Sequence, residues 1–157
     1  MTVDMSKVLP LAELVGEDAE ETKGFEELAR QARELISSFE WCAGVQEVYS
    51  GIVVAGVIGV FLVRILPARP DIDEWLWVIV GDVPPAYLVT DEASSPGEAL
   101  VVYVDLMRQW VAAVNVGQPV TDLVPVNAAP MKEFAAMLDS RLRFLLERVL
   151  PEYADGR

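Results

Sequence analysis

The chain has 157 residues, with 12 basic and 25 acidic side chains, a net charge of −13, no histidine and one cysteine. Without imidazole there is no Ser-His-Asp or Cys-His catalysis and no histidine-ligated metal, and one cysteine excludes a disulfide within the chain. The negative charge argues against binding to nucleic acid or to anionic membranes, and it favours basic partners.

Hydropathy and length set the expected size of the fold. Apolar residues make up 53% of the chain, which excludes disorder and predicts a large core. The length is close to the commonest domain size, so we expect one domain over residues 1–157. The first residues lack the basic and apolar regions of a signal peptide, and no disulfide framework is present, so we predict a cytoplasmic location.

Two helices are expected at the start of the chain. Residues 8–15 are compatible with a short helix that has Pro10 in its first turn. Asp18 and Glu21 resemble a capping box and predict the start of a second helix, which ends near Glu40. Apolar residues recur along it at steps of three and four and predict one buried face: Phe25, Leu28, Ala29, Ala32, Leu35, Ile36 and Phe39.

The middle of the chain predicts a sheet. Residues 48–63 carry no charge, but the run is too short and too rich in Val, Ile and Gly for a membrane helix. Ala55 and Gly56 mark a tight turn within it. We expect strands over residues 45–54, 57–66, 75–80 and 86–90. Their connections are too short for parallel crossovers, so an antiparallel sheet of three or four strands is expected over about 45–90.

Helices return after the strands. The run 95–98, Ser-Pro-Gly-Glu, is a capping box with proline at the first helical position, and Gly117 ends the helix that it begins. The last helix is expected over residues 130–150, where Pro151 stops it, and its apolar face is wide enough to be central or part of an interface. The order of helices, strands and helices predicts an α+β fold, with the sheet packed between N-terminal and C-terminal helices.

The run 81–87, Gly-Asp-Val-Pro-Pro-Ala-Tyr, is the most distinctive stretch for chemistry. Two interpretations remain open. In one, Asp82 lies in a binding pocket beside Tyr87, Trp75 or Trp77, where its carboxylate acts as a base or holds a metal. In the other, Asp82 accepts backbone N–H bonds in a turn fixed by the two prolines, one of them a candidate for a cis bond, and the tryptophans pack in the core.

Other polar residues give weaker signals. Cys42 has no basic neighbour in the sequence that would activate its thiol, and we expect it to be inert. Asp71, Asp73 and Glu74 form an acidic loop without the spacing of a calcium site. We therefore expect no metal site and no cofactor.

One segment carries a resemblance. Residues 75–88, reading WLWVIVGDVPPAYL, resemble a W-x-W-V-x-x-G-D-x-P-P-A-Y-L segment of small uncharacterised bacterial proteins, together with the helical run 98–111 and the loop 125–127. The resemblance covers about residues 45–150. It implies a bacterial protein, and it carries over no catalytic residue because no activity is attached to those proteins.

The distribution of charge leads to a functional expectation. Residues 71–122 hold nine acidic side chains against one basic, Arg108, whereas residues 131–157 hold five of each. We expect a non-enzymatic acidic interaction protein that is immunity-like or antitoxin-like, or an accessory subunit, and that self-associates as a dimer. The alternative is a small-molecule-binding protein or a carboxylate- or metal-dependent hydrolase with its pocket around Asp82.

Overall fold

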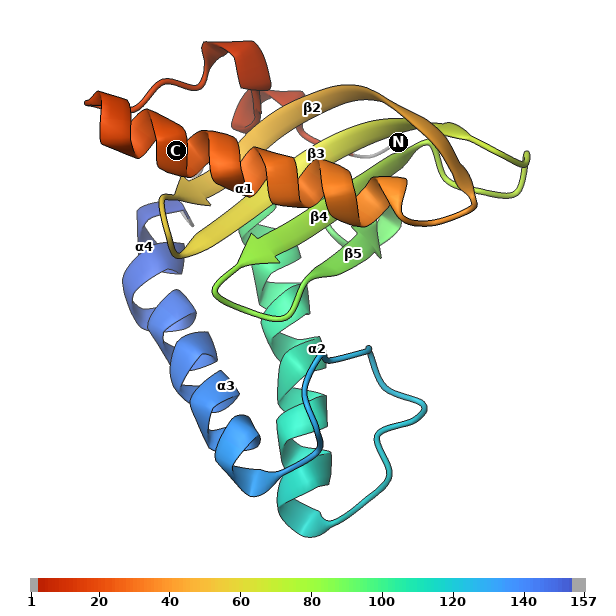
Figure 1. Ribbon diagram of the computed structural model, residues 1–157, viewed down its shortest axis with the longest axis vertical. Helices are drawn as coiled ribbons and strands as arrows, with labels where there is room; N and C mark the ends of the chain where they lie inside the picture. The colour runs from red at the N-terminus through yellow and green to blue at the C-terminus, as the bar shows by residue number, and fades with distance from the viewer. Residues whose placement is uncertain (1–2, 154–157) are drawn as a thin grey trace.

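The computed structural model describes residues 3–153, and its centre is one antiparallel sheet with helices on both faces (Figure 1). The strands lie in chain order across the sheet. They are β1 (Leu9–Pro10), β2 (Cys42–Val54), β3 (Ile58–Pro67), β4 (Trp75–Gly81) and β5 (Ala86–Val89). The α+β fold with an antiparallel sheet is confirmed, and the sheet gains a fifth strand because the two residues of β1 pair with β2.

One face of the sheet is covered by α1 (Ala19–Ser37), which lies across the strands (Figure 1). The predicted helix start is confirmed: the Asp18 carboxylate accepts a hydrogen bond from the Glu21 backbone N–H at 2.8 Å. The buried side of α1 is the predicted stripe, with Leu28, Ala29, Ala32 and Ile36 packed against inward-facing residues of the sheet. These contacts form the smaller of two apolar clusters.

The opposite face is covered by α2 (Pro96–Val116), which runs beyond the sheet and packs against α3 (Lys132–Phe144) (Figure 1). Ser95 caps α2 and Gly117, with φ +74°, ends it, as the sequence predicts. The far ends of α2 and α3 are joined by residues 117–131, which climb back toward β5 before descending to α3 (Figure 1). This layer forms the larger apolar cluster.

The first and last helices differ from the sequence prediction. Residues 8–15 contain β1 and a 3₁₀ turn, η2 (Leu11–Glu13), in place of a helix. After α3 the chain continues as a π-helical turn, η4 (Leu145–Val149), and a short helix, α4 (Leu150–Tyr153), so Pro151 does not stop it. Pro151 follows directly on the π-helical turn, where the backbone bonds, such as Leu150 N–H to the Leu145 carbonyl, already depart from the i→i−4 pattern that proline disrupts. Two further 3₁₀ turns are η1 (Met5–Lys7) and η3 (Thr90–Glu92).

Within residues 3–153, α2 is the one helix that is long and apolar enough to cross a membrane, and half of its most apolar stretch is buried inside the protein. The uncharged run at 48–63 forms no helix. It divides into β2 and β3 around a turn with Gly56 at φ +74°, as expected.

Candidate functional site

The loop that carries Asp82 is held by the backbone at its start. Gly81 has φ +134°, a conformation that side chains oppose, and a Cβ added there would lie 2.4 Å from the Val57 carbonyl oxygen. The next residue, Asp82, donates its backbone N–H to the same oxygen at 3.0 Å. The end of β4 is therefore fixed against the β2–β3 turn, and the Asp82 side chain begins from a defined position.

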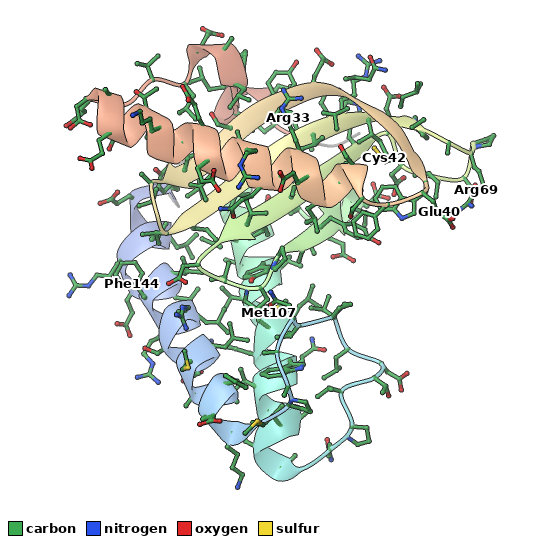
Figure 2. All side chains as sticks on the ribbon, viewed as in Figure 1. Arg33, Glu40, Cys42, Arg69, Met107 and Phe144 are labelled. Carbon is green, nitrogen blue, oxygen red and sulfur yellow. The ribbon has the colours of Figure 1, made fainter. Side chains whose placement is uncertain are left out.

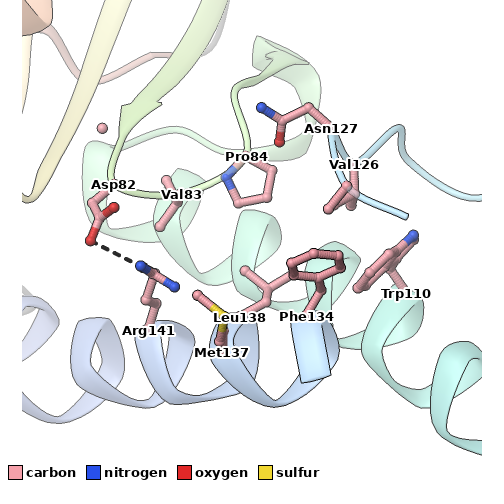
Figure 3. Close-up of a pocket in the computed structure, with 12 residues that line it drawn as sticks. Asp82, Val83, Pro84, Trp110, Val126, Asn127, Phe134, Met137, Leu138 and Arg141 are labelled. Atoms are coloured by element: carbon pink, nitrogen blue, oxygen red, sulfur yellow. Dashed lines mark hydrogen bonds and ion pairs between the residues drawn. The ribbon is translucent and has the colours of Figure 1, made fainter. Parts of the chain in front are cut away.

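The partner of Asp82 is Arg141 on α3, and neither sequence interpretation anticipated it. Arg141 Nε lies 3.0 Å from Asp82 Oδ2 (Figure 3). The two side chains are 37% and 67% exposed, so water screens the ion pair. No backbone N–H in residues 3–153 donates to the Asp82 carboxylate, which instead links the β4–β5 loop to α3 through Arg141. All peptide bonds of the described residues are trans, including those at the two prolines.

A pocket of about 310 Å³ opens beside this ion pair (Figure 3). Its walls come from the β4–β5 loop, α2, α3 and the end of the 117–131 segment. Its apolar side chains are Val83, Pro84, Trp110, Val126, Ala128, Phe134, Met137 and Leu138. The β4–β5 loop is held to α2 by Tyr103, whose hydroxyl donates to the Pro84 carbonyl at 2.5 Å. Asp82 therefore lines a hollow together with residues of α2, α3 and the 117–131 segment.

Tyr87 does not line this pocket. It lies on the sheet face covered by α1, where its ring centroid is 5.1 Å from Phe39 and 5.2 Å from Trp41, and these two rings stack at 4.8 Å. Tyr87 remains 39% exposed. The three rings form an aromatic cluster at the end of α1, beside β5.

The two tryptophans are also separate from the Asp82 pocket. Trp77 is fully buried against the α2 layer, and its indole N–H donates to the Ala93 carbonyl at 2.9 Å. Trp75 lies at the start of β4. Its ring centroid is 6.0 Å from that of Tyr49 and 5.7 Å from the guanidinium carbon of Arg64. The structure therefore brings none of the three predicted aromatic residues to Asp82, because Tyr87 lies on the other face of the sheet and the tryptophans pack elsewhere.

A strongly apolar groove of about 500 Å³ lies at the start of β5, and we call it the β5 groove. One wall is the start of β5 with the proline before it, another is the end of α1, and the third is the 117–131 segment. Its lining residues are Leu35, Phe39, Pro85, Ala86, Tyr87, Val124, Pro125, Val126 and Asn127. Sequence reasoning missed it because the three walls are far apart in the chain; the only local signals were the alternation in 86–89 and the prolines at 85 and 125.

The remaining polar candidates do not converge. Cys42 is half-buried, and its thiol lies 3.5 Å from the Gly44 carbonyl oxygen. It lies at the same end of the sheet as Arg69 (Figure 2), which pairs with Asp71 at 3.4 Å. Among residues 3–153, no three acidic, cysteine or histidine side chains are grouped closely enough to hold a metal ion.

Comparison with protein-family models, with curated proteins and with solved structures finds no match.

Proposed function

We propose that the protein acts by binding a basic protein, as an immunity-like or antitoxin-like counterpart or as an accessory subunit. The observation that carries the proposal is the uneven charge. Between Arg69 and Lys132, a stretch that supplies β4, β5, α2 and the 117–131 segment, Arg108 is the only basic residue, against nine acidic ones. Such a surface attracts cations and accelerates the encounter with a basic partner.

Shape supports binding more than catalysis. The β5 groove combines apolar walls with an aromatic cluster, and exposed aromatic side chains are typical anchors of protein interfaces. The Asp82 carboxylate, the best-placed acid, is paired with Arg141 and 67% exposed, so it is not held in the water-excluded setting in which a catalytic carboxylate works best.

The test is affinity capture with the immobilised protein from a native lysate at low salt, followed by elution with salt. The expected result is a protein of high isoelectric point that is retained at about 0.05 M salt and released at about 0.5 M, because screening shortens the reach of exposed charges. Recovery of nothing at low salt, or of acidic proteins that salt does not release, would refute the proposal.

We also propose that the protein self-associates through α3. Met137 and Phe144 are 50% and 47% exposed, and seven residues apart they lie on one side of the helix (Figure 2 marks Phe144). Residues 132–153 hold four acidic and four basic side chains, so two copies meeting there do not repel each other as the acidic stretch would.

A second candidate function is small-molecule binding or carboxylate-dependent hydrolysis at Asp82. The pocket beside the Asp82–Arg141 pair favours it, because the volume of about 310 Å³ is at the lower end of ligand sites. The experiment is a thermal-unfolding screen against divalent metals and metabolites, repeated with Asp82→Asn. A ligand of this site raises the unfolding midpoint of the wild type and raises that of the variant less. Identical shifts in both proteins would remove Asp82 from the site.

A further inference from the structure

The outer edge of β5 is unpaired. β5 is the last strand of the sheet and is hydrogen-bonded to β4 on its inner side. Within residues 3–153, no other backbone hydrogen bond reaches residues 86–89. An antiparallel edge strand directs alternate N–H and C=O groups outward, where they pair with water or with another strand. At the opposite edge, β1 pairs only with Tyr49 and Ser50 of β2. The rest of β2 is interrupted by three register shifts, irregularities of the kind that disfavour pairing with another strand.

The β5 groove lies at the start of this free edge. Ala86 and Tyr87 form the wall on the strand side, and Val124 faces them from the climbing segment. Leu35 and Phe39 of α1 close the groove. A strand that added to β5 would direct every second side chain to the same side, so one apolar side chain of such a strand would be directed into a groove of this size.

Both chain segments that carry this edge and the groove have an acidic residue close by in the sequence. Asp91 follows the end of β5 by two residues, and Asp122 precedes Val124 by two; both are exposed. Neither takes part in an ion pair among residues 3–153. Charge complementarity therefore favours a segment with lysine or arginine on either side of its apolar residue.

We propose that an extended basic segment of the partner protein adds to β5 as a sixth strand and inserts one apolar side chain into the β5 groove. The inference rests on the proposed function and specifies where and how the partner binds. A free apolar molecule would fill the groove and leave the edge unpaired, and a second copy would bring the acidic flanks of two chains together. An extended basic segment would hydrogen-bond to the free edge, place an apolar side chain in the groove and pair its cations with the acidic residues nearby.

The experiment is selection from a phage-displayed library of random peptides of about twelve residues, long enough to extend past both ends of β5. The enriched peptides are then titrated by fluorescence anisotropy against the wild type, Val124→Trp and Val120→Trp. The first substitution places a large ring in the groove. The second is the matched control, because Val120 belongs to the same segment and is similarly half-buried but does not line the groove.

The expected peptides alternate apolar and polar residues and carry lysine or arginine. Val124→Trp weakens their binding by about tenfold or more, and Val120→Trp leaves it close to wild type. Bound peptide slows amide hydrogen exchange at residues 86–89, which filling of the groove alone does not do.

Two selection results would overturn the inference: no enrichment of peptides over the Val124→Trp protein, or enrichment of acidic or uncharged peptides. Two hydrogen-exchange results would also overturn it: protection by peptide that is confined to α3, or protection of residues 86–89 that rises with protein concentration in the absence of peptide. The last would assign the edge to a second copy. If lysate capture recovers a basic protein while the peptides fail, this inference alone falls. If capture recovers nothing basic, the proposed function falls with it.

Discussion

At the scale of single residues, the environment of the Asp82 carboxylate is set by Arg141, which lies 59 positions later in the chain. Nothing in the sequence around either residue predicts the pair, because it depends on where α3 packs. The exposed ion pair contributes little to stability, but it joins the β4–β5 loop to α3 and sets one wall of the pocket. Asp82 is therefore a residue whose local sequence is distinctive and whose role is decided by tertiary packing.

Tyr103 gives a prediction at the same scale. Its buried hydroxyl holds the Pro84 carbonyl, and burial raises the pKa of Tyr103 far above its usual value of 10.0. At neutral pH we expect Tyr103→Phe to lower the free energy of unfolding by about 1 kcal/mol, the net worth of one such hydrogen bond. Urea denaturation measures this, with Tyr87→Phe as the control, because no hydrogen bond of the Tyr87 hydroxyl is present within residues 3–153.

The same residue predicts a pH dependence. Above pH 10 the unfolded chain loses the Tyr103 proton while the folded protein keeps it, so the stability that Tyr103 contributes is present below its unfolded pKa and is lost as pH rises. The difference in unfolding free energy between wild type and Tyr103→Phe should then shrink as pH rises beyond 10. A constant difference would show that folding leaves the pKa of Tyr103 unchanged, and a growing one that folding lowers it; either result would contradict the prediction.

At the scale of elements, the strongest test concerns the glycine that ends β4. Gly81→Ala is strained by φ +134° and brings a Cβ to 2.4 Å from the Val57 carbonyl oxygen, whereas Gly56→Ala, at φ +74°, meets nothing within 4 Å. We expect Gly56→Ala to cost about 1 kcal/mol and Gly81→Ala to cost clearly more, because backbone must also move. Equal unfolding midpoints in urea for the two variants would contradict this account of the loop.

Elements with local signals were the most predictable from sequence. The caps of α1 and α2, the β2–β3 turn and the two faces of α1 follow from Asp18, Ser95, Gly56 and the apolar spacing, all of which act within a few residues. The prediction of a helix over residues 8–15 was wrong because pairing with β2, some 40 residues later, outweighs the weak local preference.

The candidate site was less predictable for the same physical reason. Side-chain alternation predicts that Tyr87 and its neighbours on β5 point to opposite faces of the sheet. The sequence does not show which helix covers each face. The β5 groove needs α1, β5 and the 117–131 segment in their final positions. Its walls are non-local contacts, which periodicity in one segment cannot reveal.

At the scale of the whole molecule, the acidic and the neutral parts of the chain suggest two different interfaces. Self-association through α3 predicts that Phe144→Glu shifts the protein toward monomer, because a charge replaces a half-exposed ring at the proposed contact. Size-exclusion chromatography with light scattering over a wide range of concentration measures the shift. Val116→Glu is the control, since Val116 is 69% exposed at the end of α2. A wild type that is monomeric throughout would refute the α3 interface.

The most direct test of the central claim compares the basic protein captured by three versions of the chain at low salt. Asp91→Asn with Asp122→Asn removes two exposed negative charges, one two residues after β5 and one two residues before Val124 of the groove. Glu13→Gln with Glu17→Gln removes two exposed charges that follow β1, at the opposite edge of the sheet. If a basic partner binds at β5, the first variant loses most of the captured protein and the second retains it. Equal capture by all three, or loss only in the second, would contradict binding on the acidic β5 side.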